Sequence, residues 1–157
     1  MEDKCSTINE NEKRFLIMLD VDGFGKVNDR FGHNYGDTML KKIAQTLKLV
    51  TENEDILARL GGDEFAIFTG GFSDIDIAKE KLRIIVASMY RELKWGVKIS
   101  ISAGVSTFPT DGHSFQALYE KADIALYYAK LTGRNKYIIY EDSMEDIDTS
   151  LSLIHIS

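Results

Sequence analysis

Residues 56–68 read Ile-Leu-Ala-Arg-Leu-Gly-Gly-Asp-Glu-Phe-Ala-Ile-Phe, which is two apolar runs separated by two glycines and two acids. Apolar runs joined by a Gly-Gly dipeptide are typical of a tight β-hairpin. Glycines let a backbone approach a bulky group, and adjacent carboxylates suit a hard metal ion held against a phosphate. The stretch therefore predicts a hairpin and a metal–phosphate site, with Asp63 and Glu64 as its acids.

Apolar patterning predicts three further strands. Residues 15–19 form a continuous apolar run that ends at Asp20, and its length suits a strand buried on both faces. Residues 97–105 alternate between apolar and small or polar side chains, which is the period of a strand. Residues 137–140 form a last short strand.

Helical spacing of apolar residues predicts three helices, marked by residues 39–50, 78–89 and 115–129. We expect Asp37 to cap the first helix, Ser73 or Asp74 to cap the second, and Gly133 to end the third. The stretch 20–36, rich in glycine and polar residues, is predicted to be a loop. The mixture favours an α/β (α+β) fold with a central, mostly antiparallel sheet flanked by helices.

Composition limits the class of protein. The 157 residues fit one domain, and 44% hydrophobic with 28% charged residues is ordinary for a globular protein. A net charge of −6 argues against a general nucleic-acid surface. Cys5 is the only cysteine, which excludes a disulfide framework and a thiolate metal site. Because no apolar run approaches the roughly 20 residues of a membrane helix, we expect no membrane contact by this segment and a cytoplasmic location.

Polar groups gather at the ends of three elements. Asp20 closes the first strand, and if that strand lies beside the hairpin, Asp20 and Asp63 can share one or two Mg²⁺ ions. Lys130 and Arg134 are four residues apart, so they share one helix face if the last turn persists. Arginine and lysine hold a triphosphate well. The pattern indicates metal-assisted phosphoryl or nucleotidyl transfer.

Each of these features also has an ordinary structural interpretation. Asp20 can simply end a strand, the glycines can simply form a turn, and Lys130 with Arg134 can complement a helix C-terminus. Asp37 can serve only as a helix cap. Their joint occurrence in one short chain favours the functional interpretation.

The spaced motifs together resemble the GGDEF domain of bacterial diguanylate cyclases, from about Phe15 to Tyr140. The first signature is Asp-Val-Asp-Gly-Phe-Gly-Lys-Val-Asn-Asp at 20–29, followed by the Gly-His and Gly-Asp pairs at 32–33 and 36–37. The namesake motif is at 59–65, and the remainder is at 102–104 and 122–135. The resemblance implies a fold similar to class III nucleotide cyclases and the polymerase palm.

The resemblance also implies a reaction and the residues that perform it. Two GTP molecules are joined into cyclic di-GMP with release of two pyrophosphates, and each subunit of a transient head-to-head homodimer presents one GTP. The implied roles follow residue by residue: Asp20, Asp63 and the Val21 carbonyl for Mg²⁺ (or Mn²⁺); Asn28 and Asp37 for guanine; Gly61 and Gly62 beside the phosphates; Lys130 and Arg134 for the β- and γ-phosphates; Asp63 and Glu64 as catalytic acids.

Two positions depart from the family pattern. Gly25 replaces the usual lysine that helps to hold the terminal phosphate, although Lys26 follows, so we expect weaker GTP binding. Many members carry an inhibitory product site, Arg-x-x-Asp, whose aspartate is Asp55 here but whose arginine position is Glu52. A glutamate cannot donate to guanine or phosphate, so we expect no tight product inhibition there.

Both ends of the chain suggest a fragment of a longer protein. We expect residues 1–13 to be the remnant of a truncated N-terminal region that follows an upstream sensory domain in the full-length protein. We expect residues 14–141 to be the GGDEF domain. Residues 142–150 resemble a connector to an EAL phosphodiesterase domain. The full-length protein can carry a membrane anchor in its missing segments. Residues 151–157 match the translation of a transposon-end sequencing adapter, so we expect an artefact rather than a natural apolar tail.

The leading hypothesis is therefore a diguanylate cyclase. Its rival is a catalytically weak GTP-binding domain that regulates an adjoining EAL phosphodiesterase. A purely structural dimerisation module is disfavoured because both metal acids and both phosphate cations are present.

Overall fold

The computed structural model describes residues 12–72 and 74–147, with side chains described as far as Met144. The expected adapter tail, Cys5 and most of the expected N-terminal remnant lie outside the described residues. In chain order the elements are β1 (Arg14–Asp22), α2 (Phe24–Phe31), α3 (His33–Val50), β2 (Ile56–Gly61), β3 (Glu64–Phe68), α4 (Ile75–Met89), β4 (Arg91–Glu92), η1 (Lys94–Gly96), β5 (Lys98–Phe108), α5 (Phe115–Leu131), β6 (Lys136–Ile139) and η2 (Asp142–Ile147).

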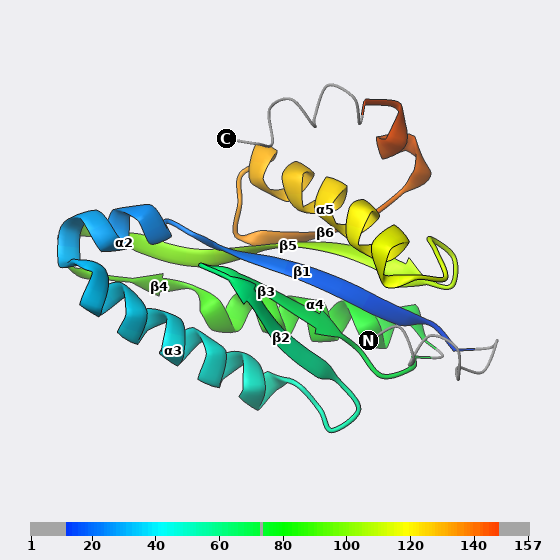
Figure 1. Cartoon of the computed structure of the whole chain (residues 1–157), viewed down its shortest axis with the longest axis horizontal. Coiled ribbons are helices and arrows are strands. Elements are labelled where there is room, and N and C mark those ends of the chain that lie inside the picture. The colour runs from blue at the N-terminus through cyan, green and yellow to red at the C-terminus, as the bar shows by residue number, and fades with distance from the viewer. Residues whose placement is uncertain (1–11, 73, 148–157) are drawn as a thin grey trace.

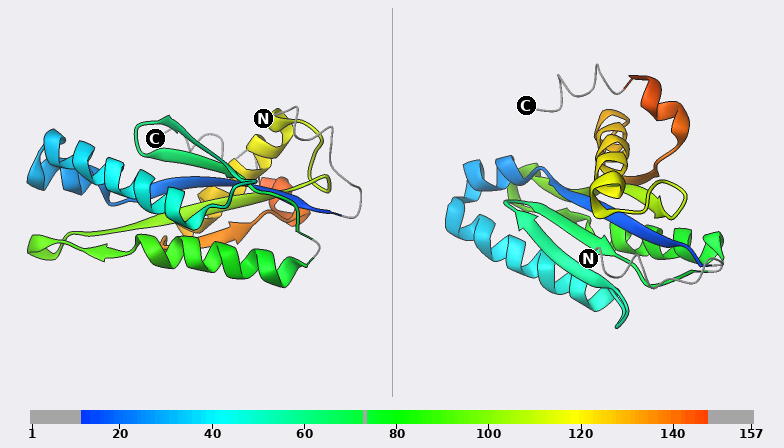
Figure 2. Two further views of the ribbon diagram at one scale, coloured as in Figure 1. Left: turned by 90° about the horizontal axis from the view of Figure 1, so that it is seen from below. Right: turned by 45° about the vertical axis from the view of Figure 1, so that its right-hand side comes forward.

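The strands form one six-stranded sheet in the order β2-β3-β1-β5-β4 (Figure 1). All of these pairs are antiparallel, and β6 adds one parallel pair along the far edge of β5. Helix α5 covers one face of the sheet, and α3 and α4 cover the other (Figures 1 and 2). The predicted fold class, a mostly antiparallel sheet flanked by helices, is confirmed.

The central strand β1 shows how the core and the polar site share one strand. Successive side chains of a strand point to opposite faces. Odd-numbered residues such as Ile17 and Leu19 pack in the cluster with α3 and α4, and the even-numbered Leu16 and Met18 pack against α5. Continuing that period, Asp20 and Asp22 lie on the α5 face, at the end of its apolar part. The sheet therefore turns polar where β1 ends.

Close packing of α5 sets the position of its last turn over this polar end. A Cβ atom at Gly104 of β5 would lie 2.0 Å from the Ala122 carbonyl oxygen and 2.2 Å from the Leu126 backbone nitrogen. Only a glycine permits that approach. The helix thus lies directly on β5, and Lys130, one turn beyond Leu126, reaches the end of β1.

Two sequence predictions about local structure were wrong, and a third was confirmed. The stretch 20–36 is not a loop, because β1 extends to Asp22 and most of the remainder lies in α2 and the start of α3. Asp37 does not cap a helix, because α3 begins at His33 and places Asp37 in its second turn. The expected capping of α4 by Asp74 is confirmed, since its carboxylate accepts a hydrogen bond from the Asp76 amide at 2.9 Å.

Candidate active site

The hairpin and the end of β1 bring Asp63 and Asp20 together. Asp20 pairs with Glu64 across the sheet, and the Val21 amide donates to the Asp63 carbonyl at 3.2 Å. Partial burial, together with the nearby Asp20 carboxylate, raises the pKa of Asp63 from 3.8 to about 6. Two carboxylates held this close repel each other unless a proton or a cation lies between them.

Asp20 itself is only partly satisfied. Its Oδ2 accepts a hydrogen bond from Lys130 Nζ, and its Oδ1 is buried without any hydrogen-bond donor. In an antiparallel strand the N–H and C=O of one residue face the same neighbour, so the Val21 carbonyl is directed to the hairpin side. Two carboxylates and a carbonyl are oxygen ligands of the kind that Mg²⁺ and Mn²⁺ take while keeping room for substrate phosphates.

The described residues hold no cluster of three or more metal-ligating Asp, Glu, His or Cys side chains. A divalent cation bound here would therefore rely on Asp20, Asp63, a backbone carbonyl and oxygens from its substrate. That arrangement is common for Mg²⁺, which usually binds one or two carboxylates together with phosphates. The residues present fit such an ion.

The hairpin tip presents its backbone at the same place. Gly61 and Gly62 have φ angles of +147° and +48°, and open space surrounds both of them. The Arg59 guanidinium braces the turn by donating to the Gly62 carbonyl from Nε at 3.0 Å and Nη2 at 2.7 Å. Glu64 is exposed and, opposite Asp20, shares its face of the sheet. Glu64 therefore borders the carboxylate pair.

Asn28 and Asp37, the residues implied for guanine, come from α2 and α3. Asn28 Oδ1 is buried without a partner and lies so close to Gly36 that a Cβ atom there would be 2.0 Å away. Asp37 follows Gly36 in the same helix and is exposed. Among the described residues only three buried side-chain N or O atoms lack a partner, and two of them are in Asp20 and Asn28.

The two predicted phosphate cations are placed differently from the expectation. Helix α5 ends at Leu131, so Arg134 does not share a helix face with Lys130, and the reasoning from their spacing was wrong. Arg134 lies in the following loop, where its Nη1 is 3.5 Å from Asp22 Oδ1. Its side chain is 55% exposed, so most of the guanidinium remains accessible.

Comparison with known proteins identifies the family. The model of the family described as "Diguanylate cyclase, GGDEF domain" matches residues 2–136. This chain belongs to the GGDEF family. Its relatives include proteins named diguanylate cyclases, so the chemistry of the family is that of a nucleotidyltransferase.

The GGDEF domain has relatives of several architectures. It is 37% identical over 149 residues to the bifunctional diguanylate cyclase/cyclic di-GMP phosphodiesterase MucR of Pseudomonas aeruginosa, covering 92% of this chain and 22% of the relative. It is 34% identical over 145 residues to diguanylate cyclase A of Treponema denticola, covering 88% and 38%. The chain thus spans well under half the length of these curated relatives.

Solved structures agree with the fold. The structure of the isolated GGDEF domain of TpbB (YfiN) from Pseudomonas aeruginosa superposes with a TM-score of 0.81 at 31% identity, covering 93% of this chain and 86% of that chain. The active GGEEF domain of a diguanylate cyclase from Vibrio cholerae has a TM-score of 0.74 at 30% identity, covering 83% and 85%.

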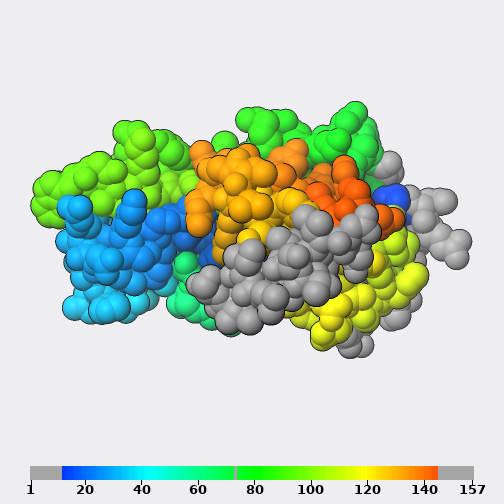
Figure 3. Space-filling view, turned by 90° about the horizontal axis from the view of Figure 1, so that it is seen from above, coloured from blue at the N-terminus to red at the C-terminus, as the bar shows by residue number. Residues whose placement is uncertain are grey.

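The segments that carry the candidate site residues lie side by side on the surface of the GGDEF domain. In Figure 3 the end of α5 and its following loop (orange) adjoin α2 (blue), and the hairpin region (blue-green) lies beside them. The candidate site is therefore composed of segments far apart in the sequence that meet on one surface. None of the described helices combines the length and apolarity needed to cross a membrane.

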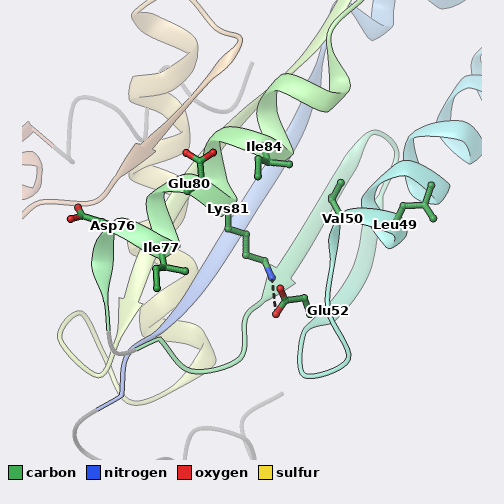
Figure 4. Close-up of a pocket in the computed structure, with 8 residues that line it drawn as sticks. All are labelled: Leu49, Val50, Glu52, Asp76, Ile77, Glu80, Lys81 and Ile84. Atoms are coloured by element: carbon green, nitrogen blue, oxygen red, sulfur yellow. Dashed lines mark ion pairs between the residues drawn. The ribbon is translucent and has the colours of Figure 1, made fainter.

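Asp55, the remaining half of the expected product site, lies in a different environment. Its Oδ1 accepts from the Gly70 amide at 2.9 Å, and its Oδ2 accepts from the Glu52 amide at 2.9 Å and Lys81 Nζ at 2.5 Å. Its side chain is 2% exposed. Lys81 also lies 4.0 Å from the exposed Glu52 carboxylate, beside a groove of about 620 Å³ between α3 and α4 (Figure 4). We call this network the Asp55 corner.

Proposed function

We propose that this GGDEF domain binds GTP with a divalent cation and, paired with a second copy, condenses two GTP molecules into cyclic di-GMP. The observation that supports the proposal most is that two of the three buried, unpartnered side-chain atoms of the described residues belong to Asp20 and Asn28. Asp20 Oδ1 and Asn28 Oδ1 are buried without partners, and the Asp63 carboxyl is held beside Asp20. Buried polar atoms in native proteins are normally paired, so these groups await a ligand.

The metal would be Mg²⁺ or Mn²⁺ held by Asp20, Asp63 and the Val21 carbonyl. Such an ion neutralises the charge that develops on the triphosphate during displacement. Lys130 donates to Asp20 in the present structure and reaches a phosphate bound beside that carboxylate. Arg134 offers a planar fork that matches two phosphate oxygens at once.

Guanine would be recognised by hydrogen-bond acceptors of the protein. Asn28 Oδ1 has no donor, and the Asp37 carboxylate is exposed on the next helix. The Watson–Crick edge of guanine carries two adjacent donors, N1–H and the N2 amino group, which suit two acceptors. Adenine has an acceptor at N1, which leaves a protein acceptor unpaired and costs affinity. We therefore expect GTP to be preferred to ATP.

The reaction requires two copies of the chain. In each of two displacements, the 3′-oxygen of one GTP bonds to the α-phosphorus of the other, and the bond from that phosphorus to the bridging oxygen of the pyrophosphate breaks. The 3′-hydroxyl proton passes to a base, for which Glu64 is the exposed candidate beside Asp20 and Asp63. One chain supplies only half of this arrangement, so the active unit is a two-fold dimer.

Incubation of the purified protein with GTP and Mg²⁺, followed by chromatography, tests the proposal. We expect one cyclic di-GMP and two pyrophosphates for every two GTP consumed, and no product from Asp63→Ala. Turnover of ATP as fast as that of GTP would contradict the assignment of Asn28 and Asp37 to guanine. GTP bound without any product would contradict the cyclase.

One observation favours a second candidate function. Gly25 has no side chain at the position where the family usually has a lysine, and nothing lies within 4 Å of its Cβ position. A domain with weakened phosphate contacts can bind GTP and regulate an adjoining EAL phosphodiesterase without useful turnover. MucR shows by its name that cyclase and phosphodiesterase occur together in one relative. Phosphodiesterase activity of the full-length protein that rises with GTP, in Glu64→Gln as in the wild type, would support this second function.

A further inference from the structure

Asp22 is a buried carboxylate that the proposed metal and substrate contacts do not use. It lies two residues beyond Asp20 on the same face of β1 and is 6% exposed. A buried carboxylate is costly unless several donors satisfy it. The groups that donate to Asp22 therefore indicate the role of its charge.

Donors from two separate parts of the chain converge on Asp22. Ser100 Oγ donates to Oδ2 at 2.6 Å, and Ser102 Oγ lies within 2.9 Å of both oxygens. The Asn135 amide donates to Oδ2 at 3.1 Å, and Arg134 Nη1 lies 3.5 Å from Oδ1. The two serines belong to β5, and the other donors belong to the loop between α5 and β6. Asp22 thus ties this loop to the end of the sheet.

The backbone of the loop needs such a tie. Gly133, Arg134 and Asn135 have consecutive positive φ angles of 121°, 62° and 52°. A left-handed conformation is unfavourable for a residue other than glycine and persists where its surroundings determine it. The Asn135 amide bonded to Asp22 and the Arg134 amide bonded to the Ala129 carbonyl at 2.9 Å are those surroundings.

The contact leaves Arg134 able to bind a phosphate. A guanidinium has five N–H donors in a fixed plane, and the closest of its nitrogens to Asp22, Nη1, is 3.5 Å from Oδ1. The side chain is 55% exposed. Because Asp20 and Asp22 share one face of β1, the guanidinium is held next to the place where Asp20 and Lys130 meet.

We propose that Asp22 is a positioning residue that holds the 132–135 loop and aims the Arg134 guanidinium at the triphosphate of bound GTP. This inference rests on the proposed function, because it takes the GTP phosphates to lie beside Asp20. It assigns to Asp22 no contact with the nucleotide or the metal. A role in fold stability alone predicts a lower melting temperature without any preference for the phosphate tail.

Equilibrium binding separates these roles. The ligands are α,β-methylene-GTP, which cannot release pyrophosphate, and GMP, which lacks the β- and γ-phosphates, both with Mg²⁺. For Asp22→Asn we expect about a tenfold loss of affinity for the triphosphate and less than a twofold change for GMP. In an Arg134→Ala background the same substitution should add less than twofold, because the residue it positions is absent.

Two serines of β5 supply the matched variants. Ser102→Ala removes one donor to Asp22 and should weaken the triphosphate about threefold while leaving Asp22 in place. Ser106→Ala removes an equally buried hydroxyl on the same strand, which bonds to the Leu118 carbonyl at 2.7 Å, and should leave binding unchanged. If Asp22→Asn fails to fold, the contrast between these two serines decides.

Several results would overturn the inference. Equal losses for GMP and the triphosphate, losses that add fully in the double variant, or equal binding by Ser102→Ala and Ser106→Ala would each show that Asp22 does not act through Arg134. Failure of the wild-type protein to bind α,β-methylene-GTP is a different result and would instead contradict the proposed function.

Discussion

The hairpin end of the domain and the Asp55 corner both hold aspartates that are largely removed from solvent. Asp20 has one oxygen without a hydrogen-bond partner, whereas both oxygens of Asp55 have partners. At the hairpin end, Asp20 Oδ1 and Asn28 Oδ1 lack partners, and Asp63 has a raised pKa. At the corner, both oxygens of Asp55 accept hydrogen bonds and Lys81 neutralises its charge. We interpret the difference as one between the proposed ligand site and a structural anchor.

The comparison also shows how a cation is used. The Lys81 side chain is only 10% exposed and pairs with Asp55, so its charge is neutralised within the protein. Arg134 approaches Asp22 to 3.5 Å, and 55% of its side chain stays exposed, so donors of its guanidinium remain accessible. A buried carboxylate can therefore either neutralise a cation or present it to a ligand.

The largest expected effect comes from Asp63→Asn. Cyclic di-GMP formation should fall by roughly 10³-fold or more, because loss of a charged group that stabilises phosphoryl transfer is costly. Stability of the metal-free protein should change in the opposite direction. In the folded protein the pKa of the Asp63 carboxyl is about 6, above its usual value of 3.8. The stability that the protonated carboxyl contributes is therefore complete below pH 3.8 and is lost as the pH rises through 6.

Thermal unfolding checks this sign. Without metal, the wild type should be less stable at pH 7.5 than at pH 5, and Asp63→Asn should gain on the order of 1 kcal/mol at pH 7.5 after solvent screening. Mg²⁺ should stabilise the wild type and not the variant. An Asp63→Asn protein that melts lower than the wild type at pH 7.5 would contradict the repulsion between Asp20 and Asp63.

A smaller effect is expected from Gly36→Ala. The new Cβ would lie 2.0 Å from Asn28 Oδ1, so the Asn28 carboxamide, which extends from α2, must move away from its position against α3. We expect a roughly tenfold or greater rise in the dissociation constant for α,β-methylene-GTP, in the range of losing a buried hydrogen bond, and a weaker preference over the adenosine analogue.

Gly25→Ala is the matched control for that experiment. It lies in the neighbouring helix with nothing within 4 Å of its Cβ position. The added methyl should leave nucleotide preference unchanged. Equal effects of the two substitutions would show that Asn28 is not held by the contact with Gly36.

At the Asp55 corner the expected effect is on stability. Asp55→Asn leaves the buried Lys81 ammonium without its partner and should cost about 3 kcal/mol in chemical unfolding. Glu52→Gln, 4.0 Å from the same ammonium but 80% exposed, should cost less than about 0.5 kcal/mol. Calorimetry should detect no micromolar cyclic di-GMP binding. Product binding that disappears with Asp55→Asn would instead make the corner a ligand site.

The smallest effect is expected from Gly25→Lys. Gly25 is exposed on the first turn of α2, with room for a long side chain. One added cation near the triphosphate should lower the KM for GTP a few-fold, about 1 kcal/mol or less at an exposed position. Steady-state kinetics at low salt measures it, and an unchanged KM would count against a role for this position.

Much of the fold followed from local pattern. The hairpin, β1 and α5 were predicted because their apolar residues have the period of the element and lie next to turn residues. The helices α2 and α3 were missed between residues 23 and 36. Gly23 and Gly32 stand at their N-terminal ends with φ of 80° and 90°, and glycines in sequence signal a loop even where they join two helices.

The roles of the site residues were expected from motifs, but the contacts around them were not. Asp22 was part of a quoted motif with no assigned role, since its donors Ser100 and Ser102 lie about 80 residues away. Likewise nothing local to Asp55 signals that Lys81 pairs with it. Such pairings depend on the register of β1 with β5 and on the packing of α4, which no single-sequence pattern specifies.

Backbone amide NMR tests the contrast between the two regions most directly. With Mg²⁺ and α,β-methylene-GTP added, we predict large shifts for residues 20–22, 28–37, 61–64 and 130–135. We predict no shifts for residues 52–55, 70 or 81, because the Asp55 corner is already satisfied. Shifts at the corner with none at the hairpin would contradict the account.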